Sequence, residues 1–144
     1  MASWKSYLFV TVQFLCLGLI GLSGPLPTAV GPLALVVCGL LLGLWGLLAM
    51  RLSQLSVLPD VRAGARLVVS GPYRLIRHPM YSSLLIACLG LVLAAPLWWR
   101  WLLWAALLAD LILKLRYEEG MLARAFPDYA AYMRRSWRLL PFVF

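Results

Sequence analysis

The sequence predicts an all-α integral membrane protein: one domain over residues 1–144, with four transmembrane helices and a C-terminal cytoplasmic amphipathic helix. Two properties of the chain indicate this class. Of its 144 residues, 64% are hydrophobic and only 12% are charged, whereas soluble domains contain roughly 45–50% apolar and 25% charged residues. Its mean hydropathy is +0.91. A soluble domain of this size could not bury so much apolar surface, and a chain this apolar is not expected to be disordered.

Four apolar runs are long enough to be read as membrane-spanning helices, each of which needs ~20 residues. They cover about 7–22, 33–50, 80–95 and 98–115. A signal peptide is the alternative for the first run, but no Ala-x-Ala cleavage site follows it, so we expect a retained span. In the second run, the spacing of Gly39 and Gly43 allows a neighbouring helix to approach closely. A cluster of tryptophans between 98 and 104 indicates a membrane–water boundary.

The arginines predict the orientation of these spans. The short turns at 23–32 and 95–101 contain one arginine between them, Arg100. The loop 51–79 and the tail after Leu115 contain the others: Arg51, Arg62, Arg66, Arg74, Arg77, Arg116, Arg124, Arg134, Arg135 and Arg138. Positive residues are retained on the cytoplasmic side. We therefore expect a multi-pass protein of the inner (cytoplasmic) membrane with both termini in the cytoplasm.

The net charge of +8 is best explained by contact with an anionic lipid leaflet, because the charges lie between and after the apolar runs. Nucleic acid is not an expected partner. The three cysteines lie far apart inside apolar runs, so neither a metal site nor a disulfide framework is predicted.

The tail combines charged and aromatic residues. Leu122, Phe126, Tyr129 and Trp137 recur at helical spacing between arginines. This pattern predicts an amphipathic helix lying on the cytoplasmic surface, with a break near Phe126 because Pro127 follows it.

Polar residues that could carry chemistry form two groups. The first, residues 71–81, reads Gly-Pro-Tyr-Arg-Leu-Ile-Arg-His-Pro-Met-Tyr and includes the only histidine, His78. Pro79 suits the first turn of a helix. The free amides of that turn, together with Arg74 and Arg77, could bind an anion. The alternative is that the arginines only set the topology and His78 only caps the helix.

The second group lies on the fourth span. Asp110, Lys114 and Glu118 are four residues apart and therefore share one helix face, and Glu119 points about 100° away from Glu118. Two interpretations are open: a structural ladder whose charged side chains pair with one another, or a functional site. In either case we expect Asp110 to be the structural partner of Lys114, because a lone charge at that depth is costly. Together the two groups would suit a ligand that carries both a carboxylate and an amino group.

The first group, written Gly71-Pro72-Tyr73-Arg74-x-x-Arg77-His78-Pro79-x-Tyr81, resembles the signature of the membrane methyltransferases that include isoprenylcysteine carboxyl methyltransferase and, as relatives, the phospholipid N-methyltransferases. The resemblance continues through Glu118-Glu119 and Phe126-Pro127-x-Tyr129-x-x-Tyr132 to Pro141, and covers roughly residues 64–141. It departs from the family at Ser83, where many members have glycine.

This resemblance implies S-adenosylmethionine as the methyl donor, bound at the cytoplasmic end of the last two spans. It implies a cofactor site made by Tyr73, Arg74, Arg77, His78, Pro79, Tyr81, Glu118 and Glu119, with Glu118, Glu119 and Arg77 as the catalytic residues. A soluble-type methyltransferase domain is excluded because the glycine fingerprint of a Rossmann fold is absent from the sequence.

The function we predict is S-adenosylmethionine-dependent methyl transfer to a lipophilic acceptor in the membrane. One alternative is a phospholipid or small-amine N-methyltransferase. Another is a small four-helix multidrug exporter, although such exporters carry a glutamate in the first span and residues 7–22 have no charge. The third alternative is a noncatalytic subunit of a larger assembly. The sequence leaves open the acceptor, the choice between O-, N- and S-methylation, and the oligomeric state.

Overall fold

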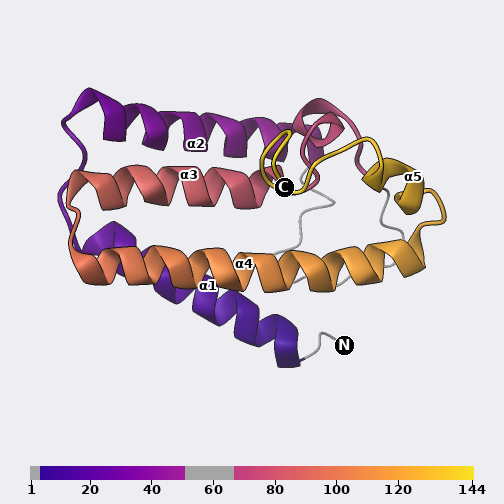
Figure 1. Ribbon diagram of the computed structural model, residues 1–144, viewed down its shortest axis with the longest axis horizontal. Coiled ribbons are helices and arrows are strands. Elements are labelled where there is room, and N and C mark those ends of the chain that lie inside the picture. The colour runs from indigo at the N-terminus through magenta and orange to yellow at the C-terminus, as the bar shows by residue number, and fades with distance from the viewer. Residues whose placement is uncertain (1–3, 51–66) are drawn as a thin grey trace.

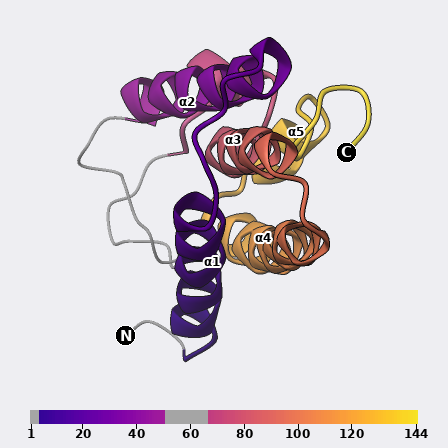
Figure 2. The same cartoon turned by 90° about the vertical axis from the view of Figure 1, so that its left-hand side faces the viewer.

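Helices make up nearly all of the regular structure in the computed structural model, which describes residues 4–50 and 67–144. Their bounds are α1 Trp4–Leu22, α2 Val30–Met50, the short 3₁₀ helix η2 Gly71–Arg74, α3 Pro79–Ala94, α4 Trp98–Ala125 and α5 Tyr129–Met133. Helices α3 and α4 run antiparallel, α2 packs along α3, and α1 crosses α4 obliquely (Figures 1 and 2). The all-α class is confirmed for the described residues.

Two of the four predicted spans meet the requirements for a membrane crossing in length and composition. Helices α1 and α2 are long and apolar enough, whereas α3 is apolar but has only 16 residues. Helix α4 starts where predicted but continues ten residues past 115, to Ala125. Its charged C-terminal part therefore belongs to the same rigid helix as its apolar part.

The two short turns lie at one end of the molecule, and η2, α5 and the C-terminus lie at the other (Figure 1). At the first end, Arg100 is fully buried. Its Nη2 donates to the carbonyl of Ile20 at 2.8 Å and its Nη1 to that of Ala95 at 3.1 Å. These carbonyls lie at the C-terminal ends of α1 and α3, where no helical partner is available. Arg100 thus joins the two turns.

The outward faces of α1 and α2 are covered by large apolar side chains. They include Phe14, Leu15, Leu40, Leu41, Leu44 and Trp45, all at least half exposed. A soluble protein rarely exposes so large a continuous apolar surface, which fits helices that face lipid. The buried apolar core lies between α1, α3 and α4 and contains Ile20, Leu85, Val92, Leu107, Leu111 and Leu115.

The predicted close approach at Gly39 and Gly43 is confirmed. A Cβ atom at Gly39 would lie 2.7 Å from the Ser83 carbonyl oxygen and from the Ala87 amide nitrogen of α3, and one at Gly43 would lie 3.0 Å from the Ser83 Oγ. The two backbones meet because α2 presents no side chain there. Ser83, where the family often has glycine, therefore faces α2.

The tail differs from its prediction. The break at Phe126 is confirmed, since this residue ends α4 in an extended conformation before Pro127. The amphipathic helix predicted for the tail is not confirmed, because α5 has only five residues and turns follow it. Tyr129, Tyr132 and Leu139 are buried. These three side chains thus pack onto the protein, whereas Leu140, Phe142 and Val143 are exposed. Of the loop arginines, Arg51, Arg62 and Arg66 lie outside the described residues.

We expect Gly39→Ala to lower the free energy of unfolding by about 1–3 kcal/mol, because the new methyl group would overlap backbone atoms of α3, which cannot move as a side chain can. Gly18→Ala in α1 is the matched control, since a Cβ there meets nothing within 4 Å and alanine favours a helix. Thermal unfolding of both variants in the same detergent measures the difference. Equal melting temperatures would show that α2 and α3 do not pack this closely.

Candidate functional site

The N-terminal start of α3 is held by the C-terminal tail. The Trp137 amide donates to the Leu75 carbonyl at 2.9 Å, the Arg77 amide to the Trp137 carbonyl at 2.7 Å, and the His78 amide to the Arg138 carbonyl at 3.0 Å. These bonds form a short parallel bridge between Ile76 and Trp137. The bridge places Arg77 and His78 next to Arg138, about sixty residues later in the chain.

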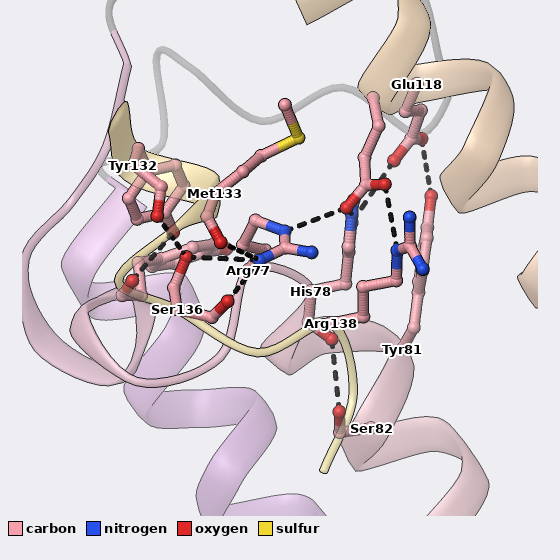
Figure 3. Close-up of polar contacts among 11 residues, drawn as sticks. Arg77, His78, Tyr81, Ser82, Glu118, Tyr132, Met133, Ser136 and Arg138 are labelled. Carbon is pink, nitrogen blue, oxygen red and sulfur yellow. Dashed lines mark hydrogen bonds and ion pairs between the residues drawn. The ribbon is translucent and has the colours of Figure 1, made fainter. Parts of the chain in front are cut away.

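The Arg77 guanidinium connects three segments of the chain. Its Nε donates to Glu119 Oε1 of α4 at 2.8 Å, and its Nη1 donates to the backbone carbonyls of Met133, at 3.1 Å, and Ser136 (Figure 3). Both the Arg77 and Glu119 side chains are only 8% exposed. Arginine suits this role because its planar group has five N–H donors in fixed directions.

Glu119 is surrounded by positive and hydrogen-bonding groups. Its Oε2 accepts a hydrogen bond from Arg138 Nε at 3.0 Å, and its Oε1 lies 3.6 Å from His78 Nε2. Burial alone would raise the pKa of this carboxyl group. Interactions with His78, Arg77 and Arg138 outweigh burial and lower the pKa to about 2. Glu119 is therefore an ionised carboxylate over the whole physiological range.

Glu118 has different partners. Its Oε1 accepts a hydrogen bond from the Tyr81 hydroxyl at 2.5 Å, and its Oε2 lies 3.6 Å from His78 Nδ1 (Figure 3). Burial raises the pKa of Glu118 above its usual value, although His78 and Tyr81 oppose the shift. Adjacent carboxyl groups whose pKa values are shifted in opposite directions are typical of sites that bind ligands or move protons.

His78 lies between the two carboxylates. Its ring is stacked on the Tyr81 ring, with centroids 5.4 Å apart and planes 4° apart. It is buried, and its Nε2 has no hydrogen-bond partner among the residues that the structure describes. His78 Nε2 lies 3.6 Å from Glu119 Oε1, too far for a hydrogen bond, so this buried nitrogen could still bind a ligand.

The predicted anion site at the start of α3 is smaller than expected. Pro79 is the first helical residue and has no amide hydrogen. The Tyr81 and Ser82 amides both donate to the His78 carbonyl. In this first turn only the Met80 amide lacks an intrahelical acceptor, so positive charge near the site comes mainly from side chains.

The structure brings together five of the eight predicted cofactor residues, namely Arg77, His78, Tyr81, Glu118 and Glu119. The other three lie around them. Tyr73 is buried, and its carbonyl accepts a hydrogen bond from the Tyr132 hydroxyl at 2.6 Å. Pro79 starts α3, and Arg74 is exposed at the end of η2. Sequence reasoning missed Arg138, because nothing in the tail distinguishes it from the other arginines there.

Asp110 and Lys114 lie on α4 before Glu118, towards the N-terminal end of the helix. The ion pair predicted between them is not among the ion pairs of the described residues. Instead, Lys114 Nζ donates to Gln13 Oε1 of α1 at 2.8 Å and lies 5.2 Å from the centre of the Tyr81 ring. Asp110 is 7% exposed, and its Oδ2 has no hydrogen-bond partner within the described ranges. Gln13 Oε1 therefore accepts a hydrogen bond from Lys114, which the sequence pattern had paired with Asp110.

Comparisons with known proteins identify related sequences but no related solved structure. A family model described as phospholipid methyltransferase matches residues 27–129. The cobalt-zinc-cadmium resistance protein CzcN of Cupriavidus metallidurans is 38% identical over 81 residues, which cover 56% of this chain and 38% of that protein. The chain thus matches well under half the length of this relative. No solved structure matches. Within residues 4–50 and 67–144, no group of three or more His, Cys, Asp or Glu residues could hold a metal ion.

We expect Glu119 to stabilise the fold in a pH-dependent way. Its pKa falls from 4.5 to about 2 on folding, so its stabilising contribution is complete above about pH 4.5 and is lost as the pH falls towards 2. Glu119→Gln should lower the free energy of unfolding at pH 7 by about 3–5 kcal/mol, because Arg77 and Arg138 lose their carboxylate. Denaturation curves of both proteins between pH 2 and 7 measure the effect.

The exposed residue Asp128 offers the control, since Asp128→Asn removes the same charge outside the site. A difference between wild type and Glu119→Gln that stays constant down to pH 2 would contradict the lowered pKa of Glu119.

Proposed function

This chain belongs to the phospholipid methyltransferase family, a family of membrane methyltransferases, and we propose that it transfers a methyl group from S-adenosylmethionine to a lipophilic acceptor held in the membrane. The observation that carries this proposal is the buried cluster of Glu118, His78 and Tyr81. It has unused hydrogen-bonding capacity and lies where the apolar part of α4 gives way to its charged part.

The residues of the cluster fit the amino-acid end of this donor. Glu118 is not paired with an arginine in the described structure, so its carboxylate is the group able to receive an ammonium. His78 Nε2, together with the partly exposed Arg138, could donate to a carboxylate. When bound, S-adenosylmethionine supplies a methyl group already activated on a sulfonium.

The other predicted residues would act on this site through the scaffold. Arg77 and Glu119 neutralise each other and hold α4 against the start of α3. Tyr73 ties η2 to α5 through its carbonyl. The protein's task is then to orient the two reactants and to exclude water, which a site buried between α3, α4 and the tail supports.

We also propose that four helices cross the inner membrane and that both termini are cytoplasmic. Support comes from the placement of the two arginine-poor turns at one end of the molecule and of α5 and the start of α3 at the other (Figure 1). The site would then lie on the cytoplasmic side, where a water-soluble donor is available, while the acceptor remains in the bilayer.

The donor prediction can be tested by calorimetry on the full chain in lipid nanodiscs. We expect S-adenosylmethionine to bind wild type, and Glu118→Gln or His78→Ala to weaken binding about tenfold to a hundredfold, the range expected for losing one hydrogen bond to a charged group. Asp128→Asn should bind as wild type does. Folded wild-type protein that does not bind the donor would overturn the proposal, and two site variants with unchanged affinity would place the donor elsewhere.

The topology can be tested by labelling with a membrane-impermeant maleimide in whole cells, using a Cys38→Ala background because Cys38 is exposed on α2. Thr28→Cys, in the turn between α1 and α2, should be labelled from outside. Ala130→Cys, an exposed position in α5, should be labelled only after the cells are opened. The reverse pattern would contradict the orientation.

A further inference from the structure

Asp110 is a buried carboxylate on α4 that the proposed donor site does not use. It is 7% exposed, and its Oδ2 has no hydrogen-bond partner among the described residues. It lies eight residues before Glu118, which is roughly 12 Å along the helix axis. An ionisable side chain at such a depth in a membrane protein is costly and usually serves a ligand or a proton path.

The residues between Asp110 and Glu118 form a polar column inside the helix bundle. Lys114, one helical turn from each of them, donates to Gln13 of α1 and lies over the ring of Tyr81 of α3. The Tyr81 hydroxyl in turn donates to Glu118. Polar side chains from α1, α3 and α4 therefore lead from the donor site to Asp110, while the adjoining α4 positions are the buried residues Leu107, Leu111 and Leu115.

The carboxylates at the two ends of this column, Glu118 and Asp110, differ in their interaction partners. At the Glu118 end, Arg77 and Arg138 pair with Glu119, while Glu118 accepts a hydrogen bond from Tyr81 and lies 3.6 Å from His78 Nδ1. At the other end, Asp110 Oδ2 has no hydrogen-bond partner among the described residues, and Lys114 Nζ donates to Gln13 Oε1. A ligand group that donates a hydrogen bond would satisfy Asp110 Oδ2, whereas a second carboxylate would place a like charge beside Asp110 in a buried site.

We propose that Asp110 binds the reacting group of the methyl acceptor, and that this group is an amine nitrogen or a thiol sulfur that carries a hydrogen, rather than a carboxylate. The inference rests on the proposed function and narrows its acceptor. The acceptor N–H or S–H donates to Asp110 Oδ2.

Asp110 also receives the proton that the reaction releases. As the acceptor nitrogen or sulfur forms its bond to the methyl carbon, the bond between that carbon and the donor sulfur breaks, and the donor sulfur keeps the electron pair and becomes a neutral thioether. The hydrogen on the acceptor atom passes as a proton to Asp110 Oδ2. One positive charge on the donor and one negative charge on Asp110 are thereby removed together, so the net charge of the buried site does not change.

The test uses the purified full chain in nanodiscs with tritiated S-adenosylmethionine and three acceptors of equal chain length: dodecylamine, dodecanethiol and dodecanoic acid. Wild type should methylate the amine or the thiol in preference to the acid. Asp110→Asn should lower kcat for that acceptor by about a hundredfold, as expected for loss of a proton acceptor, while the Kd for S-adenosylmethionine changes less than about threefold. Asp128→Asn, at an exposed position, should retain wild-type kcat.

A second readout needs no turnover. Without donor, dodecylamine or dodecanethiol should raise the melting temperature of wild type and of Asp128→Asn, but not of Asp110→Asn. If Asp110→Asn does not fold, Asp110→Glu replaces it, and should keep donor affinity while kcat falls because the carboxylate is displaced by one methylene. A purely structural role for Asp110 would lower stability without changing the acceptor preference or the ligand-induced shift.

Two kinds of failure are distinguishable. If wild type does not bind S-adenosylmethionine, the proposed function fails and this inference fails with it. If the donor binds but dodecanoic acid is the preferred acceptor, or a folded Asp110→Asn protein keeps wild-type kcat and the same ligand-induced shift, only the role of Asp110 is overturned.

Discussion

The ion pair between Arg77 and Glu119 is the contact on which the polar end of the molecule depends. One guanidinium holds the loop before α3, the C-terminal part of α4 and the carbonyls of the tail in a single arrangement. Both side chains are buried, so neither charge could remain there without the other. Arg138 also pairs with Glu119, and the backbone bonds between residues 75–78 and the tail place His78 beside Arg138.

The same pair separates the roles of two adjacent carboxylates. Consecutive residues of a helix point about 100° apart, so Glu119 faces the arginines and Glu118 faces Tyr81 and His78. The arginines keep Glu119 ionised, whereas burial raises the pKa of Glu118. We therefore propose that Glu119 serves as a structural anion and that Glu118 is the carboxylate that meets the donor.

Helix α4 links this polar end to the apolar body of the protein. Its 28 residues begin beside the buried Arg100 and end beyond Glu119. Because one continuous helix carries Asp110, Lys114 and Glu118 at four-residue intervals, their side chains form one line along the inner face. A membrane methyltransferase needs a water-soluble donor and a lipophilic acceptor to meet, and a helix polar at one end and apolar along most of its length provides a frame for both.

The sequence by itself determined the features that depend on neighbours in the chain: the apolar runs, the start of α3 at Pro79, the break before Pro127 and the family motif. Tertiary structure decided which partners meet. Arg77 pairs with Glu119 while Arg74 is exposed, and Lys114 bonds to Gln13, 101 residues away, rather than to Asp110. Helix periodicity specifies which face a side chain occupies, but a buried charge takes the best acceptor that packing brings within reach, and that acceptor comes from a segment remote in sequence.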